Sequence, residues 1–154
     1  MARKILITNL FTSGTKVLTK EYGAIAVEDI PDRTSFNVWT GSCYSIAIRN
    51  IHTEFKYKEQ QELMHIVFDN GHTLIVSKSF WFNLAGGSTA KAKDLKSGDK
   101  LKGWKCPDTT SDTVVVDLVS TCSKDYDTST LYSIQVPTFN RVMLNGIMVP
   151  GERG

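Results

Sequence analysis

The chain has 154 residues and a formal net charge of +2, with 41% hydrophobic and 22% charged residues. This length suits one hydrophobic core, and the composition excludes wholesale disorder. The small net charge argues against nucleic acid as a partner, and no apolar run is long enough to span a bilayer.

The first eight residues, MARKILIT, resemble the start of a secretory signal only superficially. Their apolar part is confined to Ile5–Ile7, which is far shorter than the apolar region of a signal peptide. We therefore do not expect the protein to be secreted by a signal peptide.

The cysteines and histidines do not predict a metal centre. Cysteines are odd in number and widely spaced, which favours reduced, mostly buried thiols. The histidines lack the close pairing of zinc ligands. We expect no metal and no cofactor; the residues concerned are Cys43, Cys106, Cys122, His52, His65 and His72.

Short runs rich in valine, isoleucine, threonine and aromatic residues predict β-strands along most of the chain. In chain order these runs are Lys4–Thr8, Lys16–Thr19, Ile25–Val27, Ser35–Thr40, Tyr44–Ile51, Glu62–Phe68, Thr73–Val76, Thr113–Thr121, Leu131–Val136 and Arg141–Val149. Asp69-Asn70-Gly71 and Asn145-Gly146 predict hairpin turns, because Asn-Gly tolerates positive φ angles. Only Thr89–Leu95 predicts a helix, of one or two turns, and residues 104–112 and 121–130 read as polar loops. The whole predicts an all-β fold with a strongly bent, compact sheet.

Three stretches, in this order, resemble the Hint module, the fold shared by inteins, hedgehog autoprocessing domains and bacterial intein-like domains. The first is GTKVLTKEYG with the following VEDI (residues 14–30). The second runs from DNG (69–71) through SKSFWF (77–82) to AKDLKSGDKL (92–101). The third combines LYSIQV (131–136) with VMLNGIMV (142–149).

The resemblance implies a horseshoe of short bent strands in which both chain ends meet near the centre. It also implies one Hint-like domain over residues 1–154, with residues 1–9 and 151–154 as short flanking segments. In the family, a Cys or Ser nucleophile, a Thr and His pair, an Asp and a terminal His-Asn pair carry out self-processing. The nucleophile position falls on Leu10, the Thr-x-x-His pair on Ser77 and Phe80, and the terminal pair on Pro150 and Gly151.

The sequence departs from the family at these positions. Leucine has no lone pair with which to attack a carbonyl, and a phenyl ring cannot transfer a proton. The family's Asp falls on Ser133, and its remaining His falls near Asn140. Hence the expected groups are missing at Leu10, Ser77, Phe80, Ser133, Pro150 and Gly151, while the turns and apolar strands remain.

We therefore expect a catalytically inactive Hint-like domain, not an enzyme, that acts as a structural or protein-binding module. Phe80 and Phe82 share one strand face and are expected to be buried, which turns Trp81 the other way. The candidate interface aromatics are Trp81, Trp104 and Trp39. Because Hint modules occur in phage genomes, the resemblance suggests a virion component (capsid decoration, neck or tail) or otherwise a cytoplasmic protein.

Two alternatives stay open. One is an autoprocessing domain with non-standard residues, in which Thr12, Ser13 or Cys43 is the nucleophile and His65 or His72 the acid. The other is a β-domain that binds carbohydrate or nucleic acid through exposed aromatics beside a lysine-rich segment. Its lysines are Lys91, Lys93, Lys96, Lys100 and Lys102.

Overall fold

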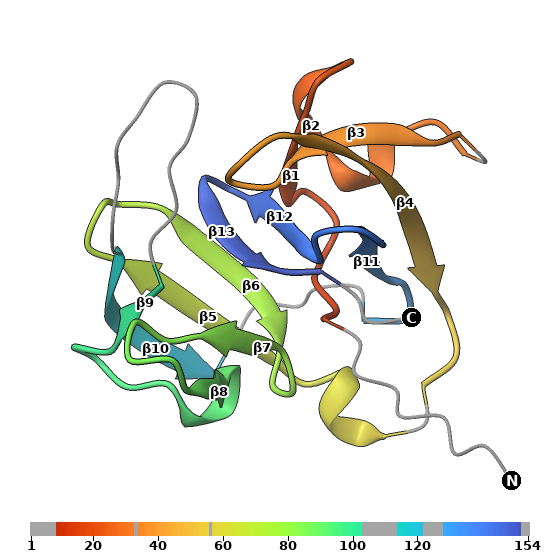
Figure 1. The fold of residues 1–154 in the computed structure, drawn as a ribbon. Helices are drawn as coiled ribbons and strands as arrows, with labels where there is room; N and C mark the ends of the chain where they lie inside the picture. Colours follow the sequence, from red (N-terminus) through yellow and green to blue (C-terminus); the bar gives the residue numbers. More distant parts are fainter. Residues whose placement is uncertain (1–8, 33, 56, 103–113, 122–127, 152–154) are drawn as a thin grey trace, which may run out of the picture.

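The structure, a computed structural model, describes residues 9–32, 34–55, 57–102, 114–121 and 128–151. The described chain is all-β, with three single-turn 3-10 helices at Val27–Asp29, Lys58–Gln60 and Ala92–Asp94. Two curled sheets stand side by side in Figure 1, with the first described residues, in red, running between them. No helix in these ranges is long and apolar enough to cross a membrane.

The larger sheet has seven strands and contains the first and the last strands of the described chain. Its order is β11 (Leu131–Gln135), β4 (Tyr44–His52), β3 (Phe36–Trp39), β1 (Lys16–Thr19), β12 (Arg141–Leu144) and β13 (Ile147–Pro150), and β2 (Gly23–Ala26) pairs with β1. All these pairs are antiparallel. The late strand β12 therefore returns to lie beside the early strand β1, with Leu144 opposite Val17.

The second sheet has the order β6 (Thr73–Ser77), β5 (Leu63–Phe68), β10 (Val114–Thr121) and β9 (Lys100–Leu101). A small hairpin of β7 (Trp81–Asn83) and β8 (Thr89–Lys91) follows β6 in the chain. Phe11 joins the two large sheets, since it forms one isolated antiparallel bridge to Val76 on β6 and another to Tyr132 on β11. Its side chain is 1% exposed and belongs to the main core.

Most predicted strands are confirmed, with boundaries that differ by one or two residues. Arg141–Val149 is not one strand but the hairpin β12–β13, which turns at the predicted Asn145-Gly146. Both residues have positive φ, at 50° and 82°, and Leu144 pairs with Ile147 across a two-residue turn. In the Asp69-Asn70-Gly71 turn only Gly71 has a positive φ, of 86°. The predicted strand Lys4–Thr8 and loop 104–112 lie outside the described residues.

The helix predicted over Thr89–Leu95 is wrong in its first half. Residues Thr89–Lys91 form β8, because they pair with β7 in the register Trp81 to Lys91 and Asn83 to Thr89. Only Ala92–Asp94 is helical, as a single 3-10 turn. Cross-strand pairing of a short segment decides its conformation here, against a weak local helix signal.

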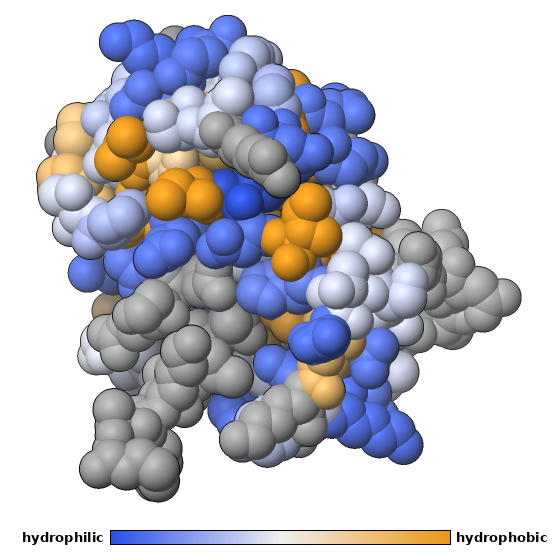
Figure 2. Space-filling view, turned by 90° about the vertical axis from the view of Figure 1, so that its right-hand side faces the viewer, coloured by the Kyte–Doolittle hydropathy of each residue, from blue (hydrophilic) through white to orange (hydrophobic). Residues whose placement is uncertain are grey.

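The outer side of β4 carries exposed apolar side chains. Tyr44, Ile46 and Ile48 share one face of the strand and are between 38% and 50% exposed, and Ile51 on the other face is 48% exposed. Figure 2 views the molecule from the side on which β4 lies in Figure 1, and its orange apolar side chains are separated by blue polar ones. This face is therefore not one continuous apolar surface.

Candidate functional site: the junction of the two chain ends

Asn9 holds the start of the described chain against its end. Its side-chain Oδ1 accepts a hydrogen bond from the Trp81 N–H at 2.8 Å. Its Nδ2 donates to the Trp81 carbonyl at 3.2 Å and to the Pro150 carbonyl at 2.9 Å. Asn9 is 3% exposed, so one buried amide joins β7, β13 and the N-terminal segment.

Leu10, the predicted position of the missing nucleophile, is a core residue. It is 1% exposed and packs with Leu63 and Leu131, and with the half-buried Phe55 and Ile75. Its carbonyl accepts a hydrogen bond from the Ser77 N–H at 3.0 Å. The structure thus brings the backbones of Leu10 and Ser77 together, and the side chain of Leu10 is an aliphatic group in the core.

The SKSFWF segment lies directly beside this junction. Phe80 and Phe82 are at most 1% exposed, and their ring centroids are 4.9 Å apart. Trp81 is half-buried, so the predicted alternation of the three aromatics is confirmed. The Ser77 hydroxyl is fully buried and donates to the Gln60 carbonyl at 2.5 Å.

Pro150 and Gly151 close the site from the other end. The Gly151 N–H donates to the Asn140 carbonyl at 3.1 Å. Gly151 is buried, and a Cβ added to it would stand only 2.7 Å from the Ile134 carbonyl oxygen. Asn140 has a φ of 49°, in the left-handed region that asparagine tolerates. The chain therefore reaches this point only with a residue that lacks a side chain.

Ser133 has a partner that the sequence did not reveal. Its hydroxyl is 2.8 Å from Nε2 of His52, and Ser133 itself is fully buried. His52 ends β4 and Ser133 lies on the adjacent β11, where Leu131 is the residue opposite His52. The sequence does not indicate this contact, because His52 and Ser133 are 81 residues apart in the chain and no local pattern joins them.

The groups proposed for non-standard autoprocessing are not brought together by hydrogen bonds. In the described ranges, Thr12 is 3% exposed and its hydroxyl donates to the Ile75 carbonyl at 3.4 Å, while Ser13 is exposed. His65 lies half-buried on β5 opposite Ile75, and His72 is exposed after the β5–β6 turn. Neither hydroxyl is hydrogen-bonded to a histidine.

Cys43 lies in the β3–β4 turn, where its Sγ is 3.9 Å from the Thr40 hydroxyl. It is a half-buried free thiol, whereas Cys106 and Cys122 lie outside the described residues. Among the residues that the structure describes, no group of three His, Cys, Asp or Glu side chains is placed to hold a metal ion.

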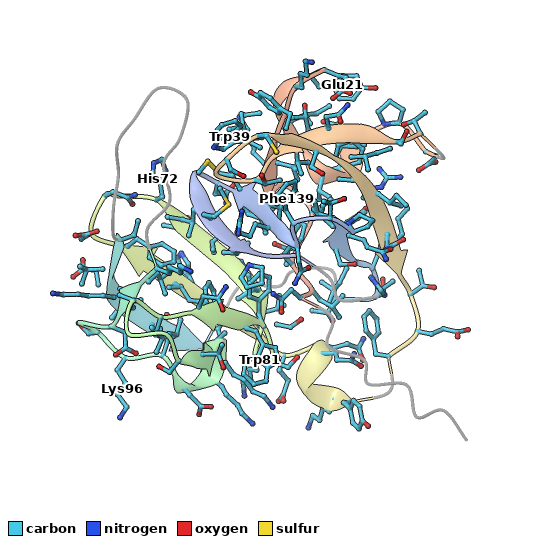
Figure 3. The ribbon with its side chains drawn as sticks, in the orientation of Figure 1. Glu21, Trp39, His72, Trp81, Lys96 and Phe139 are labelled. Carbon is cyan, nitrogen blue, oxygen red and sulfur yellow. The ribbon has the colours of Figure 1, made fainter. Side chains whose placement is uncertain are left out.

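A pocket of about 510 Å³ opens at this junction. Asn9, Trp81, Pro150 and Gly151 line it, so it lies where the two ends of the described chain meet. Further lining residues are Asn83, Lys102, Phe139, Asn140 and Arg141. In Figure 3, Phe139 is labelled near the middle of the molecule and Trp81 below it.

The remaining predicted interface aromatics lie elsewhere. Trp39 is half-buried on β3 and makes an edge contact with Tyr44, with ring centroids 5.2 Å apart. It borders the exposed apolar side of β4. Trp104 lies outside the described residues.

One carboxylate in the turn between β1 and β2, that of Glu21, has a shifted pKa. Burial acts to raise the pKa of Glu21, but hydrogen bonds from the backbone and side-chain N–H groups of Asn37 outweigh it and lower the pKa. Those bonds are 2.9 and 2.8 Å long. They tie the turn after β1 to β3.

Comparison with solved structures shows the fold. The chain is similar to the PabCDC21-1 intein, at 17% identity and a TM-score of 0.72 over 92% of this chain and 98% of that one. It is similar to a variant of the Ssp DnaB mini-intein, at 12% identity and a TM-score of 0.74 over 100% and 99% of the two chains. It is also similar to the bacterial intein-like domain from Clostridium thermocellum, at 19% identity and a TM-score of 0.61 over 93% and 99%.

No protein-family model matches the sequence, and no curated protein matches it. The structural likeness at this low identity establishes an all-β Hint fold of the intein type.

Proposed function

We propose that the chain is a catalytically inactive Hint-like domain that serves as a protein-binding or structural module in a larger assembly. The observation that carries this proposal is that Leu10 has a buried, aliphatic side chain. It lies where the resemblance places the nucleophile, is 1% exposed, and packs against Leu63 and Leu131. An aliphatic side chain in that place cannot form the covalent intermediate with which self-processing begins.

The other positions of the junction support the same reading. Phe80 stands where the resemblance places the histidine that protonates the leaving amide, and its ring is fully buried against Phe82. Gly151 stands where the resemblance places the cyclising asparagine, and the Ile134 carbonyl leaves no room for a Cβ there. At these two positions, no side chain can transfer a proton to the leaving amide or cyclise to cleave the chain.

The junction has contacts that suit a permanent structure. The side-chain amide of Asn9 makes three hydrogen bonds to Trp81 and Pro150, so the two ends of the described chain are held together. A domain that retains such a scaffold without reactive groups presents surfaces to other proteins. The assembly we propose is a phage particle, with this chain in its capsid decoration, neck or tail, and nucleic acid is not the proposed partner. The phage setting rests on the family resemblance alone.

The test is an intact-mass measurement on the chain fused at each end to a different folded carrier protein. We expect one unprocessed mass after prolonged incubation at neutral pH with and without a thiol reductant. Masses corresponding to a break before Leu10 or after Gly151, or to carriers joined without the domain, would overturn the proposal. In the native source, mass spectrometry should recover the intact chain with stoichiometric amounts of other structural proteins.

The His52–Ser133 contact favours one alternative, an autoprocessing domain with a serine nucleophile. A hydroxyl 2.8 Å from an imidazole nitrogen is the arrangement in which histidine takes the serine proton. Because Ser133 is fully buried, the carbonyl that it attacks would have to belong to its own chain. Phe11 pairs with the neighbouring Tyr132 through two hydrogen bonds of 2.9 Å, which brings the N-terminal segment to β11.

The fusion experiment also decides this alternative. If the fused chain breaks, Ser133→Ala should abolish the break, whereas Ser13→Ala, which changes an exposed hydroxyl, should leave its rate unchanged. A break that survives Ser133→Ala assigns the chemistry to another group. An unbroken fusion eliminates the alternative.

A further inference from the structure

The sequence contains two Asn-Gly pairs, Asn70-Gly71 and Asn145-Gly146, and both lie in hairpin turns. Asparagine followed by glycine is especially prone to one spontaneous reaction, in which the backbone nitrogen of the next residue attacks the side-chain amide. Glycine favours this attack because it has no side chain to obstruct its nitrogen. The same local chemistry is therefore available at two places in the chain, and the structure decides where it occurs.

The Asn70-Gly71 pair is open to this reaction. Both residues are exposed, and no atom lies within 4 Å of the position that a Cβ of Gly71 would take. Oδ1 of Asn70 accepts the His72 N–H at 3.0 Å, so this donor polarises the amide carbonyl and faces the oxygen on which negative charge develops during the attack. The Gly71 N–H donates to the Phe68 carbonyl at 3.0 Å. That bond must open for the nitrogen to react, and a surface turn opens at little cost.

The Asn145-Gly146 pair is held by other parts of the chain. Oδ1 of Asn145 accepts the Lys16 N–H at 2.8 Å, and its Nδ2 donates to the Thr73 carbonyl at 2.9 Å. The Asn145 N–H donates to the Lys16 carbonyl, also at 2.8 Å. The ring of His72, labelled in Figure 3, covers Gly146, since a Cβ there would stand 3.0 Å from its Nε2. The reaction at this turn therefore requires contacts with β1 and β6 to break together.

We propose that Asn70 is a site of spontaneous covalent modification in the folded protein and that Asn145 is protected from it. The Gly71 nitrogen forms a bond to Cγ of Asn70 and loses its proton, while the C–N bond of the side-chain amide breaks and ammonia leaves with a proton. Water then opens the cyclic imide at either carbonyl, which gives aspartate or isoaspartate at position 70. This inference goes beyond the proposed function and does not depend on it.

The products change the β5–β6 turn in two ways. Either product adds one negative charge beside Asp69, whose Oδ1 accepts the Val115 N–H of β10 at 3.2 Å. Isoaspartate also lengthens the backbone by one carbon, inside a turn that is closed by a 2.9 Å bond from the Phe68 N–H to the His72 carbonyl. Storage should therefore produce charge variants of the uncut chain that ion-exchange chromatography separates.

The test is peptide mapping by mass spectrometry of the full chain, stored for several weeks in mildly alkaline buffer, against an unstored sample. Trypsin cuts after lysine and arginine, so Asn70 and Asn145 fall in separate peptides, residues 59–78 and 142–153, with no other asparagine in either. We expect the first peptide to gain about 1 Da, with isoaspartate at position 70. Its rate of gain should be about tenfold or more above that of the second peptide. No gain in the first peptide, or equal gain in both, would overturn the inference.

Unfolding separates the effect of the fold from that of the local sequence. In concentrated guanidinium chloride the same chain loses the bonds that join Asn145 to Lys16 and Thr73. The two peptides should then gain mass at rates within about threefold of each other. A difference of about tenfold that persists in the unfolded chain would assign it to the neighbouring residues and overturn the structural argument.

Matched variants identify the reacting residue. Asn70→Gln lengthens the side chain by one carbon, which disfavours closure of the ring, and should lower the gain in peptide 59–78 about tenfold or more. Asn83→Gln changes an asparagine that is followed by Leu84 and should leave that gain unchanged. Equal gains in the two variants would overturn the assignment to Asn70. An uncut chain without the gain refutes this inference alone, whereas a cleaved fusion refutes the proposed inactivity alone.

Discussion

Removing the side-chain amide of Asn9 should destabilise the whole domain. Asn9→Ala takes away one acceptor and two donor bonds, which leaves the Trp81 N–H and the carbonyls of Trp81 and Pro150 short of a partner. A buried polar group left in this way costs about 1–3 kcal/mol. Because these bonds are only partly buried, we take the lower end for each and expect a loss of about 3 kcal/mol. That is a large part of the roughly 5–15 kcal/mol by which a domain is stable.

Urea unfolding, followed by circular dichroism, measures this loss. With a slope of about 2 kcal/mol per molar urea, the midpoint should fall by about 1.5 M. The control is Asn70→Ala, which removes one exposed bond to the His72 N–H in a turn and should cost less than about 1 kcal/mol. If Asn9→Ala stays within about 0.5 kcal/mol of the parent chain, Asn9 does not hold the two ends together and the reasoning fails.

Asn9→Asp refines the same prediction. The carboxylate keeps the acceptor for the Trp81 N–H but faces the carbonyls of Trp81 and Pro150 with negative charge in place of two donors. At neutral pH it should be at least as destabilising as Asn9→Ala. Protonation restores one donor, so the Asp variant should gain stability relative to the Ala variant as pH falls toward 4; a constant difference would contradict this account.

Three further predictions concern packing and charge. Gly151→Ala should lower the unfolding free energy by about 1–3 kcal/mol because its Cβ has no room, whereas Gly86→Ala, with no atom within 4 Å, should be neutral in the same urea assay. Phe80→His should cost about 2–4 kcal/mol by burying an imidazole in an apolar site, and the fused chain should still show one unprocessed mass because Leu10 is unchanged; cleavage in this variant would refute the assignment of inactivity to Leu10. The hydrogen bonds from Asn37 lower the pKa of Glu21 in the folded state, so the stability they supply is present above the ordinary pKa of glutamate and is lost as pH falls through the folded value. The pH dependence of the urea midpoint between pH 7 and 3 should therefore be flatter for Glu21→Gln, and an unchanged profile would contradict this assignment.

The sequence predicts the strands well because each is a local pattern with a turn at its end. The Asn145-Gly146 turn is found as predicted, since only residues that accept positive φ permit a two-residue hairpin turn there. The segment Thr89–Lys91 was misassigned because its conformation depends on pairing with β7, and a three-residue strand has too few residues to show an alternating pattern.

The site is less predictable than the fold because its contacts join residues far apart in the chain. Asn9 and Pro150 are 141 residues apart, and nothing in the residues around an asparagine indicates a bond over such a separation. The His52–Ser133 contact spans 81 residues and was missed for the same reason. The sequence predicts only that Gly151 stands at a position where the family has a functional side chain. The structure adds a packing reason for glycine there, because a Cβ would lie too close to the Ile134 carbonyl oxygen.

The proposed inactivity of the junction is linked to the stability of the same site. A reactive centre keeps polar groups in a buried place, and such groups cost free energy unless they are paired. Here the buried positions hold Leu10 and Phe80, whose burial stabilises the fold, and the buried amide of Asn9 makes three hydrogen bonds. Placing a catalytic group at these positions therefore removes packing contacts at the point where the two sheets and both ends of the described chain meet. On this reasoning single substitutions toward the reactive residues should yield less stable chains before they yield active ones.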